Sequence, residues 1–220
     1  MSRTPPRPEL PALPYAKLFA DPEMFDSQKT LVAAGFMVKR RSSDHKMMVA
    51  SHSTVPGYLF KKFGRRVPCG DQRENYRTRV RGAEEIRALI EKHRLGRLTV
   101  VRKWIYQLPP QFASGRRCPE LLVVERADLL SKNESKRRYQ TIDRVTLEQL
   151  CRVLHAFSGF DAAIHNLKFT TAGQIAFFDT ESYDRPHRPI ERTFRYLFEE
   201  LTKESRKIAE RMFEHLDDEQ

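Results

Sequence analysis

Apolar patterns of two different periods follow one another along this chain in a defined order. Three short strand-like runs come first, a helical period follows over 74–92, and two more strand-like runs come after it. The strand-like runs are residues 36–39, 47–50, 58–63, 98–106 and 121–124. This order predicts an α+β fold whose first part contains a five-stranded antiparallel sheet and one helix.

The second part of the chain is expected to be mainly helical. After a polar and charged stretch, a helix is predicted to begin at Thr146, where Gln149 would complete a capping box. A hairpin is predicted over 167–178, with Asp179 closing its second strand. One long amphipathic helix is predicted from Ile190 onward.

The same patterns suggest a division into three parts. Residues 1–14 hold five of the 13 prolines and show no helical period, so they are expected to form a flexible tail. The strands and helix over 15–124 would form an amino-terminal lobe. Residues 125–220 would form a smaller carboxy-terminal lobe.

Composition restricts the classes of partner. The 220 residues include 40 Lys and Arg against 29 Asp and Glu, a formal net charge of +11, which favours a phosphate-bearing ligand. No RRM, KH or zinc-finger signature is present, so a nucleotide is expected rather than a nucleic acid. The three cysteines, Cys69, Cys118 and Cys151, are far apart and odd in number, which predicts reduced thiols. No apolar run approaches the roughly 18 residues of a membrane span.

Three polar residues stand in a spacing that suggests chemistry. Asp161 and Asn166 are five positions apart, and Asp179 follows at the end of the hairpin. This arrangement resembles the protein-kinase core, in which an HRD-x4-N loop precedes a hairpin that ends in DFG. The resemblance implies that Asp161 faces the substrate hydroxyl, and that Asn166 and Asp179 bind a Mg²⁺ ion on the nucleotide phosphates. A second Asp-x4-Asn pair, Asp128 and Asn133, has no helix before it and no Asp 13 residues after it.

The first half of the chain resembles a kinase amino lobe in its order of strands and helix. The resemblance implies a third-strand lysine that contacts the α- and β-phosphates of ATP. Lys61 fits this position, and Lys62 is the alternative if the strand register differs by one residue. A helix glutamate would hold that lysine. Glu85 is preferred to Glu84 because apolar residues follow it three and four positions later.

The resemblance also implies where ATP would bind. Glu125 and Ala127 lie after the fifth predicted strand, where backbone groups of a kinase meet the adenine edge. The chain has no GxGxxG loop. Ser42, Ser43 and Lys46 of the loop between the first two strands are expected to contact the phosphates in its place.

Several departures from the kinase pattern narrow the resemblance. The residue before Asp161 is Phe160, so the arginine that would bind a phosphorylated activation loop is missing. DFG is replaced by Asp179, Thr180 and Glu181, and only about 40 residues follow. The chain is therefore similar to a two-lobed kinase with a reduced helical lobe, of the kind found among bacterial effectors delivered into host cells.

The sequence leads to one main hypothesis and two alternatives. The main hypothesis is an ATP- and Mg²⁺-dependent phosphotransferase acting on hydroxyl side chains of a protein substrate, such as a host protein. Such an enzyme would be cytoplasmic, or secreted into a host cell without a cleaved signal. One alternative is a small-molecule kinase of the choline or aminoglycoside type, in which an acidic residue stands where Glu181 does. The other is a pseudokinase or a basic binding module.

Overall fold

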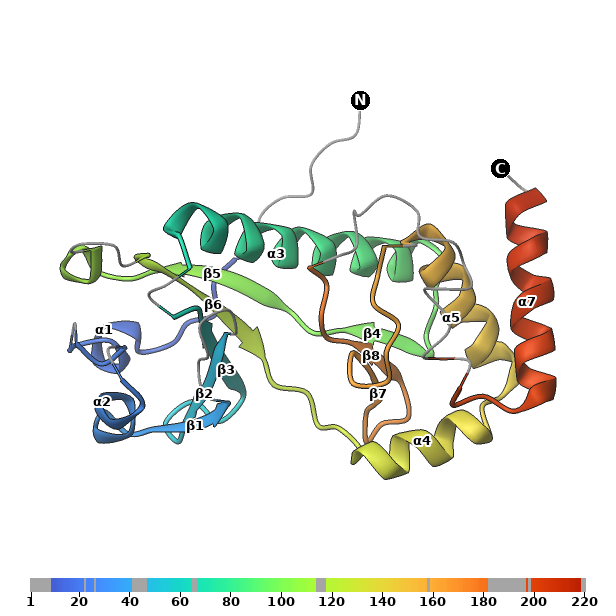
Figure 1. Cartoon of the computed structure of the whole chain (residues 1–220), viewed down its shortest axis with the longest axis horizontal. Helices are drawn as coiled ribbons and strands as arrows, with labels where there is room; N and C mark the ends of the chain where they lie inside the picture. The colour runs from blue at the N-terminus through green and yellow to red at the C-terminus, as the bar shows by residue number, and fades with distance from the viewer. Residues whose placement is uncertain are drawn as a thin grey trace. The chain divides into compact units, whose positions relative to one another are not determined.

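The computed structural model divides into two units. It describes residues 9–21, 23–25, 27–40, 47–64, 67–113, 118–157, 159–181, 197 and 199–218. The first unit comprises Met1–Val80 and Arg102–Arg126, and the second comprises Arg81–Val101 and Ala127–Gln220. Figure 1 labels the helices and strands of both units. Segment 81–101, expected in the amino-terminal lobe, groups with the second unit.

The first unit is built on a five-stranded antiparallel sheet of order β1-β2-β3-β6-β5. Its strands are β1 (Phe36–Arg40), β2 (Met48–His52), β3 (Tyr58–Lys62), β5 (Lys103–Gln107) and β6 (Glu120–Glu125). Its helices are α1 (Tyr15–Leu18), α2 (Gln28–Ala33), the 3-10 helix η1 (Pro110–Ala113) and the first part of α3 (Cys69–Lys92). The predicted α+β class and five-stranded antiparallel sheet are confirmed.

One face of this sheet carries the apolar core of the first unit. Phe60 of β3 stands opposite Val123 of β6, and Val123 stands opposite Trp104 of β5. Directly paired residues point to the same side of an antiparallel sheet, and all three are buried in one cluster. The ring of Phe19, next to α1, packs edge-on against Phe60 at 5.4 Å. The side chain of Lys61 therefore belongs to the opposite face of the sheet.

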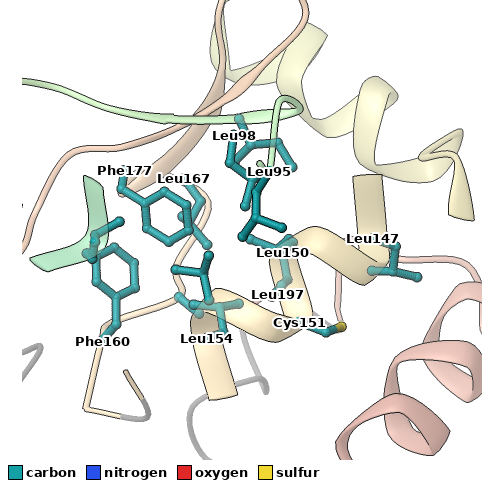
Figure 2. Packing of buried hydrophobic residues seen from close by; sticks show 14 of the residues in the cluster. Leu95, Leu98, Leu147, Leu150, Cys151, Leu154, Phe160, Leu167, Phe177 and Leu197 are labelled. Atoms are coloured by element: carbon teal, nitrogen blue, oxygen red, sulfur yellow. The ribbon is translucent and has the colours of Figure 1, made fainter. Parts of the chain in front are cut away.

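The second unit holds a small mixed sheet and several helices. Its strands are β4 (Leu98–Val100), β7 (Leu167–Phe169) and β8 (Ile175–Phe177), with β8 central, parallel to β4 and antiparallel to β7. Its helices are the last part of α3, α4 (Lys132–Gln140), α5 (Arg144–Ala156) and α7 (Lys203–Asp218). Figure 2 shows the shared core, in which the apolar side of α5 packs against side chains of the strands.

The sequence predicted one strand over 98–106, but the structure has two strands there, β4 and β5. β4 pairs with β8 in the second unit, and β5 pairs with β6 in the first. The buried and less buried positions alternate along β4, but Val100 and Val101 are both buried, so the alternation breaks there. The amide of Val101 still donates to Phe177 O at 3.3 Å, whereas Arg102 begins the crossing to the other sheet.

Two helix starts differ from the prediction. α5 begins at Arg144, because Asp143 caps it by accepting bonds from the amide and the hydroxyl of Thr146 at 2.9 and 2.7 Å. Gln149 completes no capping box there, and its side chain accepts a bond from the amide of Arg97 at 2.8 Å. α3 begins at Cys69, five residues before the predicted start at 74.

The final helix is shorter than predicted in the part of the chain that the structure describes. Thr202 caps α7 by accepting a bond from the amide of Ser205 at 3.1 Å, and residues 199–202 before it are not helical. Residues 190–196, where the long helix was predicted to begin, lie outside the described residues. Among the described residues, every helix is too short or too polar to cross a bilayer.

Candidate functional site

A tight loop joins α5 to β7 and carries Asp161 and Asn166. One carboxylate oxygen of Asp161 accepts a bond from the amide of Ala163 at 3.2 Å, which forms an Asx turn. The carbonyl of Ala163 then accepts bonds from the amides of Asn166 at 2.8 Å and Leu167 at 3.2 Å. Local bonds of this kind fix the loop between the end of the helix and the start of the strand.

The side chain of Asn166 ties the two ends of this loop together. Its Nδ2 donates to the main-chain carbonyl of Asp161 at 3.2 Å and to a carboxylate oxygen of Asp161 at 3.1 Å. Asn166 is only 6% exposed, so its amide needs such partners. Because both of these Asp161 oxygens are acceptors, they fix the orientation of the Asn166 side-chain amide. Its Oδ1 atom is then the one that can bind a cation.

The hairpin brings Asp179 next to this loop. Leu167 of β7 pairs with Phe177 of β8, and one step further the amide of Phe178 donates to the carbonyl of Asn166 at 3.0 Å. Asp179 follows Phe178 directly, at the same end of the hairpin as Asn166. The three residues singled out by their spacing therefore lie in one part of the second unit.

Phe160 packs into the core and holds one end of the Asp161 loop in place. It is 1% exposed, and its ring packs against that of Phe177 with centroids 5.2 Å apart (Figure 2). The residue before Asp161 thus fills the core beside the strand that leads to Asp179. An arginine at this position would bury a charge among apolar side chains.

The second Asp-x4-Asn pair takes a different structure. Asp128 is exposed on a loop, and its main-chain carbonyl accepts a bond from Thr171 at 2.9 Å. Asn133 lies inside α4, a helix that the sequence analysis left as polar chain. The capping box of Ser131 and Glu134 is the signal that would have revealed α4. The shared spacing therefore does not by itself produce the Asp161 loop.

α4 contributes a residue that the sequence analysis missed. Tyr139 is completely buried, and its hydroxyl donates to the carbonyl of Leu167 at 3.1 Å. Its ring also packs edge-on against Phe169, with centroids 5.0 Å apart. Tyr139 thus supports β7, the strand that starts at the Asp161 loop.

Lys61 and Lys62 differ sharply in their surroundings. Lys62 is buried on the core face of the first sheet, and its Nζ donates to the main-chain carbonyls of Cys118 at 2.5 Å and Glu120 at 2.9 Å. Burial lowers the pKa of Lys62 to about 8. Lys62 is thus bound within the first unit, and Lys61, on the opposite face, remains the candidate for contact with phosphate.

The two glutamate candidates lie in the second unit. Glu84 forms an ion pair with Arg87 on the same helix. Glu85, one position further, is half-buried and is not part of that pair. The predicted pairing of Lys61 with Glu85 joins residues of different units and stays a prediction.

The predicted nucleotide contacts are described only in part. Glu125 ends β6, and its side chain accepts a bond from the amide of Arg102 at 3.3 Å. Ala127 is the first residue of the second unit after the crossing. The loop residues predicted to cover the phosphates lie outside the described residues; they are Ser42, Ser43 and Lys46.

The donor atoms of the Asp161 loop suit a hard cation held together with phosphate. In the described part of the chain, no three His, Cys, Asp or Glu side chains gather as a metal site. Mg²⁺ on a nucleotide takes one or two protein ligands and completes its shell with phosphate and water. One carboxylate from Asp179 and one amide oxygen from Asn166 fit that requirement. No protein-family model, curated protein or solved structure matches this chain.

Proposed function

We propose that this protein is an ATP- and Mg²⁺-dependent phosphotransferase that phosphorylates hydroxyl side chains of a protein substrate. The observation that carries the proposal is the bonding of Asn166 Nδ2 to the main-chain carbonyl and to one carboxylate oxygen of Asp161, with Asp179 at the adjoining end of the hairpin. This arrangement supplies an oriented carboxylate and two oxygen donors, which are the groups that phosphoryl transfer requires.

Asp161 is the proposed acceptor of the substrate proton. Its side chain is exposed, so a hydroxyl group can approach it. Bonds from Asn166 Nδ2 and the Ala163 amide hold its carboxylate in one orientation. A carboxylate held in this way orients the hydroxyl group and takes its proton as the oxygen attacks phosphorus.

Asn166 and Asp179 are the proposed ligands of Mg²⁺. Asn166 would contribute Oδ1, since its nitrogen is engaged by Asp161. Asp179 would contribute a carboxylate oxygen from the end of the hairpin. A bound Mg²⁺ neutralises charge on the transferred phosphoryl group and its leaving group.

The remaining roles rest on the resemblance to kinases. Lys61 would contact the α- and β-phosphates of ATP, and Glu85 would hold Lys61 in place. Backbone groups at Glu125 and Ala127 would contact adenine. Lys61 lies on the face of β3 opposite the apolar core, and this position supports Lys61 over Lys62 as the residue that contacts the phosphates.

A small-molecule substrate is the second candidate. Glu181 stands two positions after Asp179, and its amide approaches a carboxylate oxygen of Asp179 at 3.5 Å. Some small-molecule kinases place an acidic residue there.

The test is transfer of labelled phosphate from γ-labelled ATP in the presence of Mg²⁺. The purified chain would be assayed with a protein mixture, and separately with choline and an aminoglycoside. Asp179→Ala should abolish transfer. Asp128→Ala is the matched control, because Asp128 belongs to the second Asp-x4-Asn pair and is exposed, so this variant should keep wild-type activity. Equal activity of wild type and Asp179→Ala would refute the proposed metal ligand.

A further inference from the structure

Two cysteines far apart in the sequence meet within the first unit. Cys69 is the first residue of α3, and Cys118 lies two residues before β6. The thiol of Cys118 donates to the main-chain carbonyl oxygen of Cys69, with the sulfur 3.9 Å from that oxygen. Both cysteines are free thiols. This contact was not expected from the sequence, where 48 residues separate them.

Charged side chains hold the segments that carry the two cysteines. Lys62 Nζ holds the backbone on both sides of Pro119 through the carbonyls of Cys118 and Glu120. The carboxylate of Glu120 is in turn 3.1 Å from the guanidinium of Arg73 on α3. These contacts fix the segment that carries Cys118 against the first turns of α3.

We propose that Cys69 and Cys118 are an oxidisable dithiol that forms an intramolecular disulfide with a peroxide. This proposal does not depend on the phosphotransferase activity. Its basis is the position of the Cys118 thiol beside the backbone of Cys69. The contacts of Lys62 and the ion pair of Arg73 with Glu120 hold the two segments in this arrangement.

The two cysteines have different roles in the reaction. Cys69 is partly exposed, whereas Cys118 is buried. Burial also raises the pKa of the Cys118 thiol to about 11, which makes it the poorer first nucleophile. Cys69 therefore reacts first, and Cys118 acts as the resolving thiol.

The chemistry balances with hydrogen peroxide as the only other reactant. The sulfur of Cys69 attacks one peroxide oxygen and the O–O bond breaks. A sulfenic acid forms on Cys69, and one water molecule is released. The sulfur of Cys118 then attacks the sulfenic sulfur, and the hydroxyl group leaves as a second water molecule. The two thiols lose two protons and two electrons in total, and the peroxide takes these up to become two water molecules.

The resulting bond would fasten the start of α3 to the segment before β6. Cys151 provides an internal control, because it is fully buried in the core of the second unit. Burial raises the pKa of Cys151 to about 12, so it should not react.

The experiment follows the thiols of the whole chain by mass spectrometry. Reduced protein is treated with hydrogen peroxide, unfolded, alkylated with iodoacetamide and digested with trypsin. The expected product is a reducible link between peptides 67–73 and 118–126, while the peptide containing Cys151 remains fully alkylated. The rate should not depend on protein concentration, since the bond is intramolecular.

Variants give the matched controls. Cys151→Ala should form the link at the wild-type rate. Cys118→Ala should form no link and should leave Cys69 as a sulfenic acid that reacts with dimedone. Alkylation of all three cysteines after peroxide treatment would overturn the proposal, as would a link that involves Cys151 or joins two chains.

Discussion

Asn166 connects the loop backbone, the Asp161 carboxylate and the hairpin. Its Nδ2 bonds to Asp161 twice, and its carbonyl pairs with Phe178. In the proposed mechanism the same side chain orients the base and supplies a metal ligand. Loss of this one amide should therefore affect chemistry more than stability.

We expect Asn166→Ala to lower the rate of phosphate transfer by about 100-fold or more, because it removes a metal donor and releases Asp161. The free energy of unfolding should fall by only about 1 kcal/mol, because the lost bonds lead to the exposed Asp161. Rates with labelled ATP and urea unfolding curves measure both effects. A variant that unfolds fully, or one with wild-type turnover, would contradict this role.

Lys62 makes the free energy of unfolding depend on pH in the alkaline range. Burial lowers its pKa from 10.5 to about 8, so between these values the unfolded chain binds more protons than the folded one. Stability from this group therefore rises as pH increases from about 8 to 10.5, by about 3 kcal/mol at most.

As pH rises from about 8 to 10.5, we expect the unfolding free energy of wild type to increase relative to that of Lys62→Met. Urea unfolding at pH 7, 8, 9 and 10 in the presence of a reductant measures the difference and keeps the cysteines reduced in both proteins. A pH-independent difference would mean that Lys62 keeps its ordinary pKa.

The residues of the candidate site were found from the sequence because their spacing is local. Asp161 and Asn166 lie on one short loop, and a hairpin with a turn at Gly173 brings Asp179 back to it. Gly173 has a φ of +86°, a conformation that glycine adopts without strain. The sequence showed only that Phe160 stands where a kinase has an arginine. The packing of Phe160 against Phe177 was not predicted, because residue spacing does not reveal such contacts.

Helix starts were less predictable than helix interiors. The apolar stripe of α5 was read correctly, but its cap was assigned to Thr146 when Asp143 performs it. Both residue types cap helices, and only the bonds distinguish them. α4 was not predicted because its exposed side chains are all polar or charged, and just two of its side chains, Ser135 and Tyr139, are buried.

The cap of α5 can be tested directly. We expect Asp143→Ala to lower the unfolding free energy by about 1 kcal/mol at pH 7. Bonds from the side chain and amide of Thr146 lower the pKa of Asp143, so this contribution is present above its ordinary pKa of 3.8. It should be lost as pH falls below that value. Thermal unfolding of both proteins at pH 7 and pH 3 measures it, and Asp128→Ala serves as the exposed control. An equal effect at both pH values would contradict the role of the carboxylate.

At the scale of the whole molecule, the antiparallel sheet was predictable and the mixed sheet was not. Consecutive strands β1, β2 and β3 pair as neighbours, which follows the usual preference for adjacent pairing. β4 instead pairs in parallel with β8, whose residues lie 77 positions after their partners in β4. Local apolar patterns carry no information about such a partner, so β4 was joined to β5.

Asp161, Asn166 and Asp179, which carry the proposed chemistry, all belong to the second unit. In the proposed function, Asp161 accepts the substrate proton during phosphate transfer. Binding of ATP and Mg²⁺ is assigned to other residues. Replacement of Asp161 should therefore separate binding from turnover.

The most direct test compares Asp161→Ala with wild type in two quantities, the dissociation constant for ATP with Mg²⁺ and the rate of transfer from γ-labelled ATP. We predict a dissociation constant within about threefold of wild type and a rate lower by about 100-fold or more. Transfer by Asp161→Ala at the wild-type rate, or absence of transfer by the wild-type protein, would contradict the account.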